Sequence, residues 1–315
     1  MGFFDRLYYG KAGKRDYTEM DMPKTRTSLF FLVLKDRFFD LVKLNFLQLI
    51  FWLPFLIWTM VNLVVVQSID AAAILSAENG SATLLNTLSS YMVVWLIGLI
   101  PCLLITGPSS AGAAYVMRNW SRDQHAFLFS DFKDAFKSNW KQAIGVSLIT
   151  SVVPLLAYIS MIYYGQMANG NMLMYVPMIL VLSMAFVWTL MLPLLYPMLI
   201  GYELRFKDVC KNAALMAVAS LPKMVASRLI TLIPIILLGV GVYIGNGIIV
   251  IAVSLYYLLI GFAFSKLVYA SFANGVFDRF LNPHIEGADV ALGLRPQDAD
   301  EDDEDDEDED EDDEE

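Results

Sequence analysis

The chain has 315 residues, of which 57% are hydrophobic and 17% charged, and its net charge is −11. Soluble domains usually carry about 25% charged residues, and the apolar residues here form blocks long enough to cross a bilayer, so the composition excludes an ordinary soluble domain. Because residues 298–315 hold 17 acidic side chains and no basic one, the rest of the chain carries a net charge of +6.

The first region, residues 1–43, is polar and basic. Residues 29–40 have apolar and charged side chains at the spacing of an amphipathic helix, which is typical of a helix in the membrane interface. We therefore expect a cytoplasmic N-terminal segment over 1–43 that contains one interfacial helix.

The second region, residues 44–280, contains six apolar stretches that are long enough, or nearly so, to cross the hydrocarbon core as helices. The fifth is short and is expected to begin nearer Met224, and the fourth is long enough to tilt or kink. The predicted fold class is all-α, a polytopic membrane bundle of six transmembrane helices with interfacial amphipathic helices. The six stretches are 44–66, 88–106, 143–164, 172–200, 229–244 and 248–265.

The basic residues predict the orientation of these helices, because lysine and arginine concentrate in cytoplasmic loops. All 22 of them fall before the first span, between the second and third, between the fourth and fifth, or after the sixth. We therefore predict a multi-pass protein of the cell membrane with both termini in the cytoplasm. Arg228 and Lys266 lie at cytoplasmic margins of spans, and the absence of charge from the span centres disfavours a proton-coupled pump.

The segment 106–114 at the end of the second span combines hydroxyl side chains, glycine, proline and alanine. One interpretation is a helix that restarts at Pro108, whose first free amides form an anion or ligand site. The alternative, which we favour, is a kink followed by a face of small residues that allows close helix packing. The candidate ligand residues are Thr106, Gly107, Ser109 and Ser110.

The connection after the second span alternates aromatic and basic side chains at helical spacing. Such a helix lies in the interface, with its rings at the acyl boundary and its cations at the anionic headgroups. A docking surface for a partner protein is the alternative, and we favour membrane anchoring. The predicted membrane-interface residues are Phe129, Phe132, Lys133, Phe136, Lys137 and Trp140.

The third region, residues 281–315, ends in the polyanion. Like charges at this density repel one another and have little apolar surface to bury, so we expect a disordered acidic cytoplasmic tail. We favour a solubilising role for the tail over binding of a cationic partner.

Common catalytic and metal-binding motifs are missing from the sequence. Cys102, Cys210, His125 and His284 are too scattered to suggest a metal site or a disulfide, and neither a phosphate-binding loop nor a zinc-protease histidine pair is present. We therefore predict a protein that is not an enzyme, with no catalytic residue, no metal, no cofactor and no nucleic-acid partner. The expected partners are the lipid bilayer and another membrane protein such as a sugar permease.

Several short motifs resemble the YesL family of bacterial integral membrane proteins. The resemblance extends from Met1 to about Phe280 and does not include the acidic tail. It lies in fold-shaping residues, so no functional residue is implied by it. The motifs are Met1-Gly2-Phe3-Phe4, Tyr9-Gly10-Lys11, Lys43-Leu44-Asn45-Phe46 with Pro54, Ile105-Thr106-Gly107-Pro108 with Tyr115, Phe129-Ser130-Asp131-Phe132 and Asn139-Trp140-Lys141.

The resemblance implies a family of uncharacterised activity that is named after a member encoded among carbohydrate-utilisation genes. We therefore expect a non-enzymatic accessory or regulatory component linked to carbohydrate uptake. The alternative is a small-molecule transporter or facilitator, because five of the six spans contain proline, which breaks the backbone hydrogen bonding that transporters reuse in binding sites. The prolines are Pro54, Pro101, Pro154, Pro177, Pro193, Pro197 and Pro234.

Overall fold

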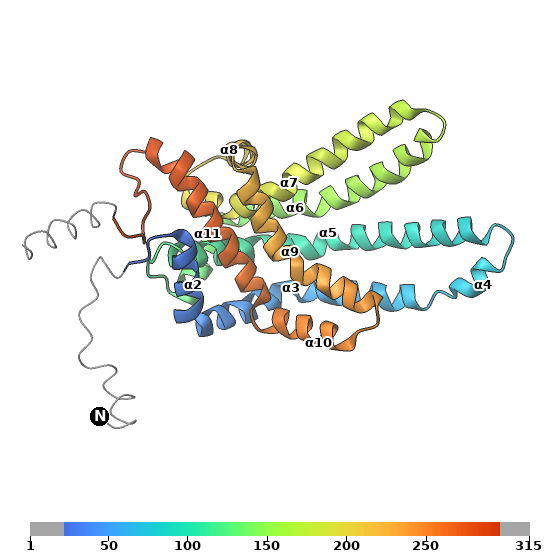
Figure 1. Cartoon of the computed structure of the whole chain (residues 1–315), viewed down its shortest axis with the longest axis horizontal. Helices are drawn as coiled ribbons and strands as arrows, with labels where there is room; N and C mark the ends of the chain where they lie inside the picture. The colour runs from blue at the N-terminus through green and yellow to red at the C-terminus, as the bar shows by residue number, and fades with distance from the viewer. Residues whose placement is uncertain (1–21, 297–315) are drawn as a thin grey trace, which may run out of the picture.

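A computed structural model describes residues 22–296, which are all-α (Figure 1). Residues 1–4 and 9–11, which carry part of the family resemblance, and residues 297–315 of the acidic tail lie outside the described part. The elements are α2 (Arg26–Asp36), α3 (Phe38–Gln67), α4 (Ala71–Leu75), α5 (Gly80–Trp120), α6 (Leu128–Ala168), η2 (Met172–Met174), α7 (Tyr175–Gly201), α8 (Phe206–Ala219), α9 (Leu221–Tyr243), α10 (Gly247–Tyr256), the π-helical turn η3 (Tyr257–Gly261), α11 (Phe262–Phe280) and η4 (Asn282–His284).

The prediction of six spans is confirmed, because six helical segments of the described chain are long and apolar enough to cross a membrane. They are α3, α5, α6, α7 with η2, α9, and the run from α10 to η4. Several are longer than predicted: α5 and α6 have 41 residues each. At 1.5 Å per residue such a helix is about 60 Å long, roughly twice the hydrocarbon thickness, so both helices continue beyond the bilayer.

The separate interfacial helix expected over 129–140 is not observed. These residues form the first turns of α6, which runs without interruption into the third span. The prolines also leave their helices continuous: α5 passes through Pro101 and Pro108. The alternative of a helix that restarts at Pro108, which we did not favour, is therefore not observed.

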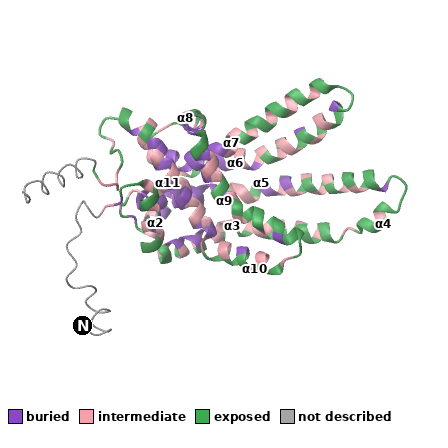
Figure 2. Cartoon of the chain, in the orientation of Figure 1, coloured by how far each residue is buried: buried purple, intermediate pink, exposed green. Residues whose placement is uncertain are grey.

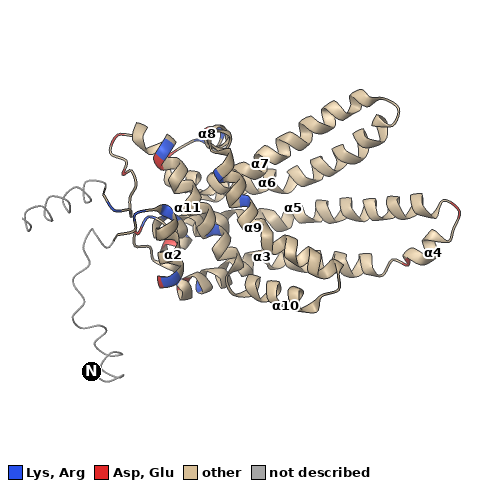
Figure 3. Cartoon of the chain, viewed as in Figure 1, with Lys and Arg blue, Asp and Glu red and all other residues tan. Residues whose placement is uncertain are grey.

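The basic residues of the described chain lie mostly at one end of the helical bundle, which we call the basic end. Figure 3 shows the lysines and arginines gathered at the end where α2, α8 and the last turns of α11 lie, whereas the helices leading to α4 carry almost none. From the basic end, the α3–α5 pair and the α6–α7 pair extend as two hairpins that diverge toward the opposite end (Figure 1). The sorting of charge seen in the sequence therefore corresponds to one end of the folded bundle.

The core also lies toward the basic end, where Figure 2 shows most of the buried residues. Two apolar clusters form it, one joining α7, α8 and α11, the other joining α2, α3, α5 and α11. Trp120, Leu194 and Phe277 are among the fully buried side chains. By contrast, no more than 28% of the most apolar window of any span is buried. Most side chains in the apolar windows of the six spans are therefore not covered by other parts of the described chain.

Asn45 in α3 holds the π-helical turn of the sixth span. Its amide Nδ2 donates to the carbonyls of Tyr257 and Leu258 at 3.0 and 2.8 Å, and its Oδ1 accepts from the amides of Phe262 and Ala263 at 2.9 and 3.2 Å. A π-turn leaves backbone groups without their usual helical partners. One buried side chain with two donors and two acceptor sites satisfies these four groups.

The C-terminal segment departs from the predicted boundary at residue 281. Residues 281–296 fold back on the basic end instead of leaving it as disordered chain. Arg26 of α2 pairs with Asp278 at 2.6 Å and donates to the carbonyl of Leu292 at 2.8 Å. Burial raises the pKa of the Tyr202 phenol, which donates to Asn282 at 2.6 Å. These contacts have partners far away in sequence, so local composition did not reveal them.

α9 and α10 are joined by a tight turn that contains Gly245 and Asn246. Gly245 has a φ of +68°, a conformation that glycine adopts without a steric penalty. Asn246 then caps α10, its side chain accepting from the amides of Ile248 and Ile249 at 3.1 and 3.3 Å.

Candidate functional site

Four helices meet around Tyr196 of α7. Its hydroxyl lies 3.2 Å from the hydroxyl of Ser147 in α6 and also interacts with Ser110 of α5. The ammonium nitrogen of Lys266, from α11, lies 4.8 Å from the centroid of the Tyr196 ring. We call Ser110, Ser147, Tyr196 and Lys266 the Tyr196 cluster. It joins hydroxyl groups and one cation in a largely buried position.

The segment 106–110 contributes to this cluster through close packing. A Cβ atom at Gly107 would collide with the hydroxyl of Ser147 and would lie 2.6 Å from the carbonyl oxygen of Ala143. α5 and α6 therefore touch at Gly107, which is how small residues act in membrane helices. The hydroxyl of Thr106 donates to the Leu103 carbonyl within α5.

Ser109 and Ser110 differ in what they contact. Ser109 donates to the Thr106 carbonyl, and its own carbonyl accepts from Nε2 of Gln48 at 2.9 Å. Because both serines lie inside a continuous helix, they do not supply the free amides of a helix start. Anion binding at Thr106, Gly107, Ser109 and Ser110 stays a prediction, and Ser110 alone of the four belongs to the Tyr196 cluster.

A second cation lies on α9. The guanidinium of Arg228 donates through Nη1 to the hydroxyl of Tyr269, and its Cζ lies 5.7 Å from the centroid of that ring. The Tyr269 hydroxyl also lies 3.1 Å from that of Thr231. Tyr269 stands one turn beyond Lys266 on the same helix, so the two cations are neighbours. The sequence indicates that both lie at span margins, but it does not show that the fold brings them together.

The predicted membrane-interface residues divide into two groups. Phe132 is buried in the core and Phe136 packs against it, so these rings are not free to enter the acyl boundary. Phe129 and Trp140 are exposed, as are Lys133 and Lys137. Membrane-interface contact by these four stays a prediction. Helical spacing identified an aromatic stretch but not which rings face the core.

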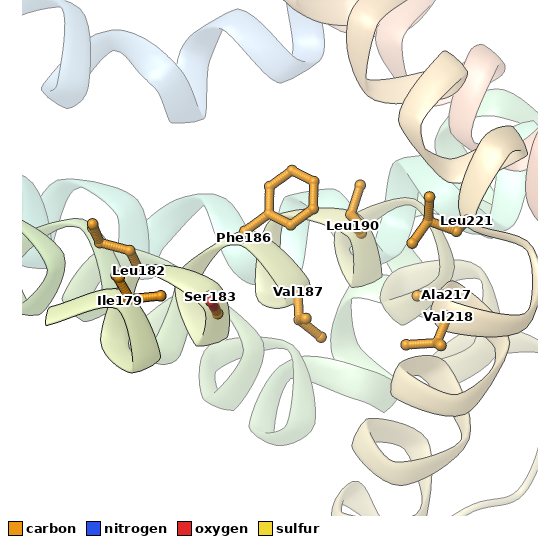
Figure 4. A pocket seen from close by; sticks show the side chains of 9 residues that line it. All are labelled: Ile179, Leu182, Ser183, Phe186, Val187, Leu190, Ala217, Val218 and Leu221. Carbon is orange, nitrogen blue, oxygen red and sulfur yellow. The ribbon is translucent and has the colours of Figure 1, made fainter. Parts of the chain in front are cut away.

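A shallow apolar groove of about 450 Å³ lies on the lateral face of α7, where α8 and α9 meet it (Figure 4). Figure 4 shows Ile179 and Leu182 at one end, Leu221 and Val218 at the other, and Phe186 between them. Ser183 and Ala217, which are small, also line it. The α7 part of the groove lies within the predicted fourth span.

The described residues offer little for covalent chemistry. Among the described residues 22–296, no group of three or more metal-ligating side chains comes together. Cys102 and Cys210 are free and each is partly buried. Burial raises the pKa of the Cys210 thiol, which weakens it as a nucleophile. What the Tyr196 cluster and Arg228 can supply is positive charge and hydroxyl groups, which suit recognition of an anion.

Taken with its six apolar helices, this arrangement defines an all-α, multi-pass membrane protein. Residues 84–161 match the model of a family described as "Protein of unknown function, DUF624". The match covers most of α5 and α6 and so includes Gly107, Ser110 and Ser147. No curated protein and no solved structure matches the chain.

Proposed function

We propose that this chain is a non-enzymatic accessory or regulatory protein of the cell membrane that is linked to carbohydrate uptake and belongs to the YesL family. The motif resemblance supports the family, and the match of residues 84–161 to a family of unknown function agrees with it. The carbohydrate link comes from the resemblance. The structural support for an accessory role is the groove on α7.

The groove suits a transmembrane helix of a second membrane protein. Ser183 and Ala217 leave room for the close backbone approach that helix packing in lipid requires. Phe186 and Leu221, both exposed, stand on either side of them and would flank a docked helix. An accessory protein without a large external domain must contact its partner within the membrane or at its basic end. We therefore propose a sugar permease as the occupant.

Photo-crosslinking from the groove tests this role. A photoreactive amino acid at Leu182 or Val218 should form an adduct with a carbohydrate permease subunit, identified by mass spectrometry after crosslinking in intact cells. The control is Ile57 on α3, which is 60% exposed on a different hairpin. Adducts of Leu182 and Val218 with lipid only, or the same adducts from Ile57, would contradict docking in the groove.

The proposed orientation has a separate test with two matched serines. In a background carrying Cys102→Ser and Cys210→Ser, a membrane-impermeant maleimide added to intact cells should label the Ser76→Cys variant and not the Ser138→Cys variant. Both positions are exposed, at opposite ends of the chain's charge distribution. After the cells are broken, both variants should react. Labelling of the Ser138→Cys variant in intact cells would reverse the proposed topology.

Facilitated transport is the second candidate function. The observation in its favour is the pair Arg228 and Lys266, because cations within spanning helices mark anion paths in membrane proteins. Purified protein in proteoliposomes should then take up an anionic solute without any other component. Uptake by the chain alone would favour transport over the accessory role, and its absence together with the permease adduct would favour the accessory role.

A further inference from the structure

Arg228 and Lys266 carry positive charge that the fold does not neutralise. Among residues 22–296 the ion pairs are Arg26 with Asp278 and Lys43 with Asp40, so neither cation has an acidic partner there. The two charges also repel one another. Unbalanced cations in a spanning helix are costly and are usually paired or functional. An anion from outside the chain would remove this repulsion.

The surrounding groups are arranged for such an anion. Nε of Arg228 is buried and has no hydrogen-bond partner. Tyrosine rings hold both cations in place: Tyr269 receives a hydrogen bond from Arg228, and Tyr196 lies under the ammonium of Lys266. Arg228, Lys266 and Tyr269 each keep part of their surface exposed. A guanidinium beside an ammonium and a hydroxyl is a combination that recognises phosphate.

The position of the two cations relative to the hydrocarbon core indicates which kind of anion they would meet. At 1.5 Å per residue, Arg228 lies about 22 Å along α9 from its end at Tyr243, and Lys266 about 28 Å along the sixth span from Gly247. The hydrocarbon core is about 30 Å thick. The cations therefore lie near the boundary between the acyl chains and the headgroups at the basic end. Phosphate is the abundant anion of that layer, and basic pockets between spanning helices bind lipid headgroups there.

We propose that Arg228 and Lys266, with Tyr269 and Tyr196, form a binding site for a phosphate group at the basic face of the membrane. The group belongs either to the headgroup of an anionic phospholipid or to a free phosphate-bearing solute. The site does not depend on the role in carbohydrate uptake, since it rests on the two charges, their depth and the groups around them.

The test uses the purified full-length chain and two phosphate probes. One arm compares phosphatidylglycerol with phosphatidylcholine, whose phosphate is balanced by a choline cation, by native mass spectrometry and by the thermal unfolding midpoint. The other compares inorganic phosphate with chloride at equal ionic strength. Retention of phosphatidylglycerol with a raised midpoint indicates a lipid ligand, and stabilisation by inorganic phosphate indicates a free one. Either result supports the site.

Variants show whether the effect belongs to these residues. The double variant Arg228→Gln, Lys266→Gln should lose about tenfold or more in apparent affinity for the active probe, because both charge-assisted contacts are removed. The matched control Lys211→Gln, Lys223→Gln removes two exposed lysines and should bind like the parent chain. If the double variant fails to fold, the charge-preserving exchange Arg228→Lys, Lys266→Arg should retain binding within a few-fold.

Three outcomes would overturn the proposal. Neither probe stabilises the parent chain more than its own control does; or the lysine control loses as much affinity as the Arg228→Gln, Lys266→Gln variant; or the charge-preserving exchange folds but does not bind.

Discussion

Replacing Asn45 by leucine should lower the free energy of unfolding by several kcal/mol. Asn45 satisfies the carbonyls of Tyr257 and Leu258 and the amides of Phe262 and Ala263. Leucine has the same number and branching of side-chain heavy atoms but no polar atom, so these backbone groups would lose their partner. Each buried polar group left without one costs about 1–3 kcal/mol. The measurement is reversible unfolding in mixed detergent micelles, followed by helicity.

The matched control for this experiment is Asn86→Leu. Asn86 is exposed on α5, and its side chain makes no hydrogen bond within the described chain. The same chemical change there should alter stability by less than about 0.5 kcal/mol, the usual size for a surface position. If the two leucine variants proved equally stable, the π-helical turn of the sixth span would not depend on Asn45.

The second large effect is expected at Gly107. The Gly107→Ala variant should be destabilised by about 1–3 kcal/mol, the range for overpacking in a filled core, because the new methyl group would collide with Ser147 and approach the Ala143 carbonyl. A lowered midpoint of thermal unfolding in mild detergent would show it. The Tyr196 cluster should also be disturbed, since Ser147 belongs to it.

Two further variants decide whether the α5–α6 contact is the cause. Gly165→Ala adds the same methyl group to α6 at a place with nothing within 4 Å, and should be neutral or slightly stabilising. Adding Ser147→Ala to Gly107→Ala removes one of the two collisions and should restore part of the lost stability. A Gly165→Ala variant as unstable as Gly107→Ala would show that any added methyl group is harmful.

These contacts show what several of the motifs that resemble the family do in the folded chain. The Lys43-Leu44-Asn45-Phe46 motif contains the residue that holds the π-helical turn, and Ile105-Thr106-Gly107-Pro108 contains the closest approach of α5 to α6. The aromatic stretch after the second span contains Phe132, which is buried in the core. All three motifs thus shape the bundle, as the sequence interpretation expected of them.

The sequence could not assign several side chains to their partners. Helical spacing placed Phe132 and Trp140 on one aromatic stretch, but only packing buries Phe132 and leaves Trp140 exposed. One of the two interpretations of Pro108 was a helix start, whereas α5 is continuous there. Composition assigned residues 281–296 to a disordered tail because no local pattern shows that Arg26 donates to the carbonyl of Leu292.

By itself, the sequence determined that the chain is a six-span helical membrane protein and which of its connections carry basic charge. Hydrocarbon length and the cost of moving cations across lipid act on local stretches, so they can be evaluated without knowing the fold. Only the tertiary structure decided that Lys266, Arg228, Tyr196 and Ser110 come together from four different helices. Helix packing in lipid depends on shape and close approach between distant residues, and these are properties of pairs of helices and not of any one stretch.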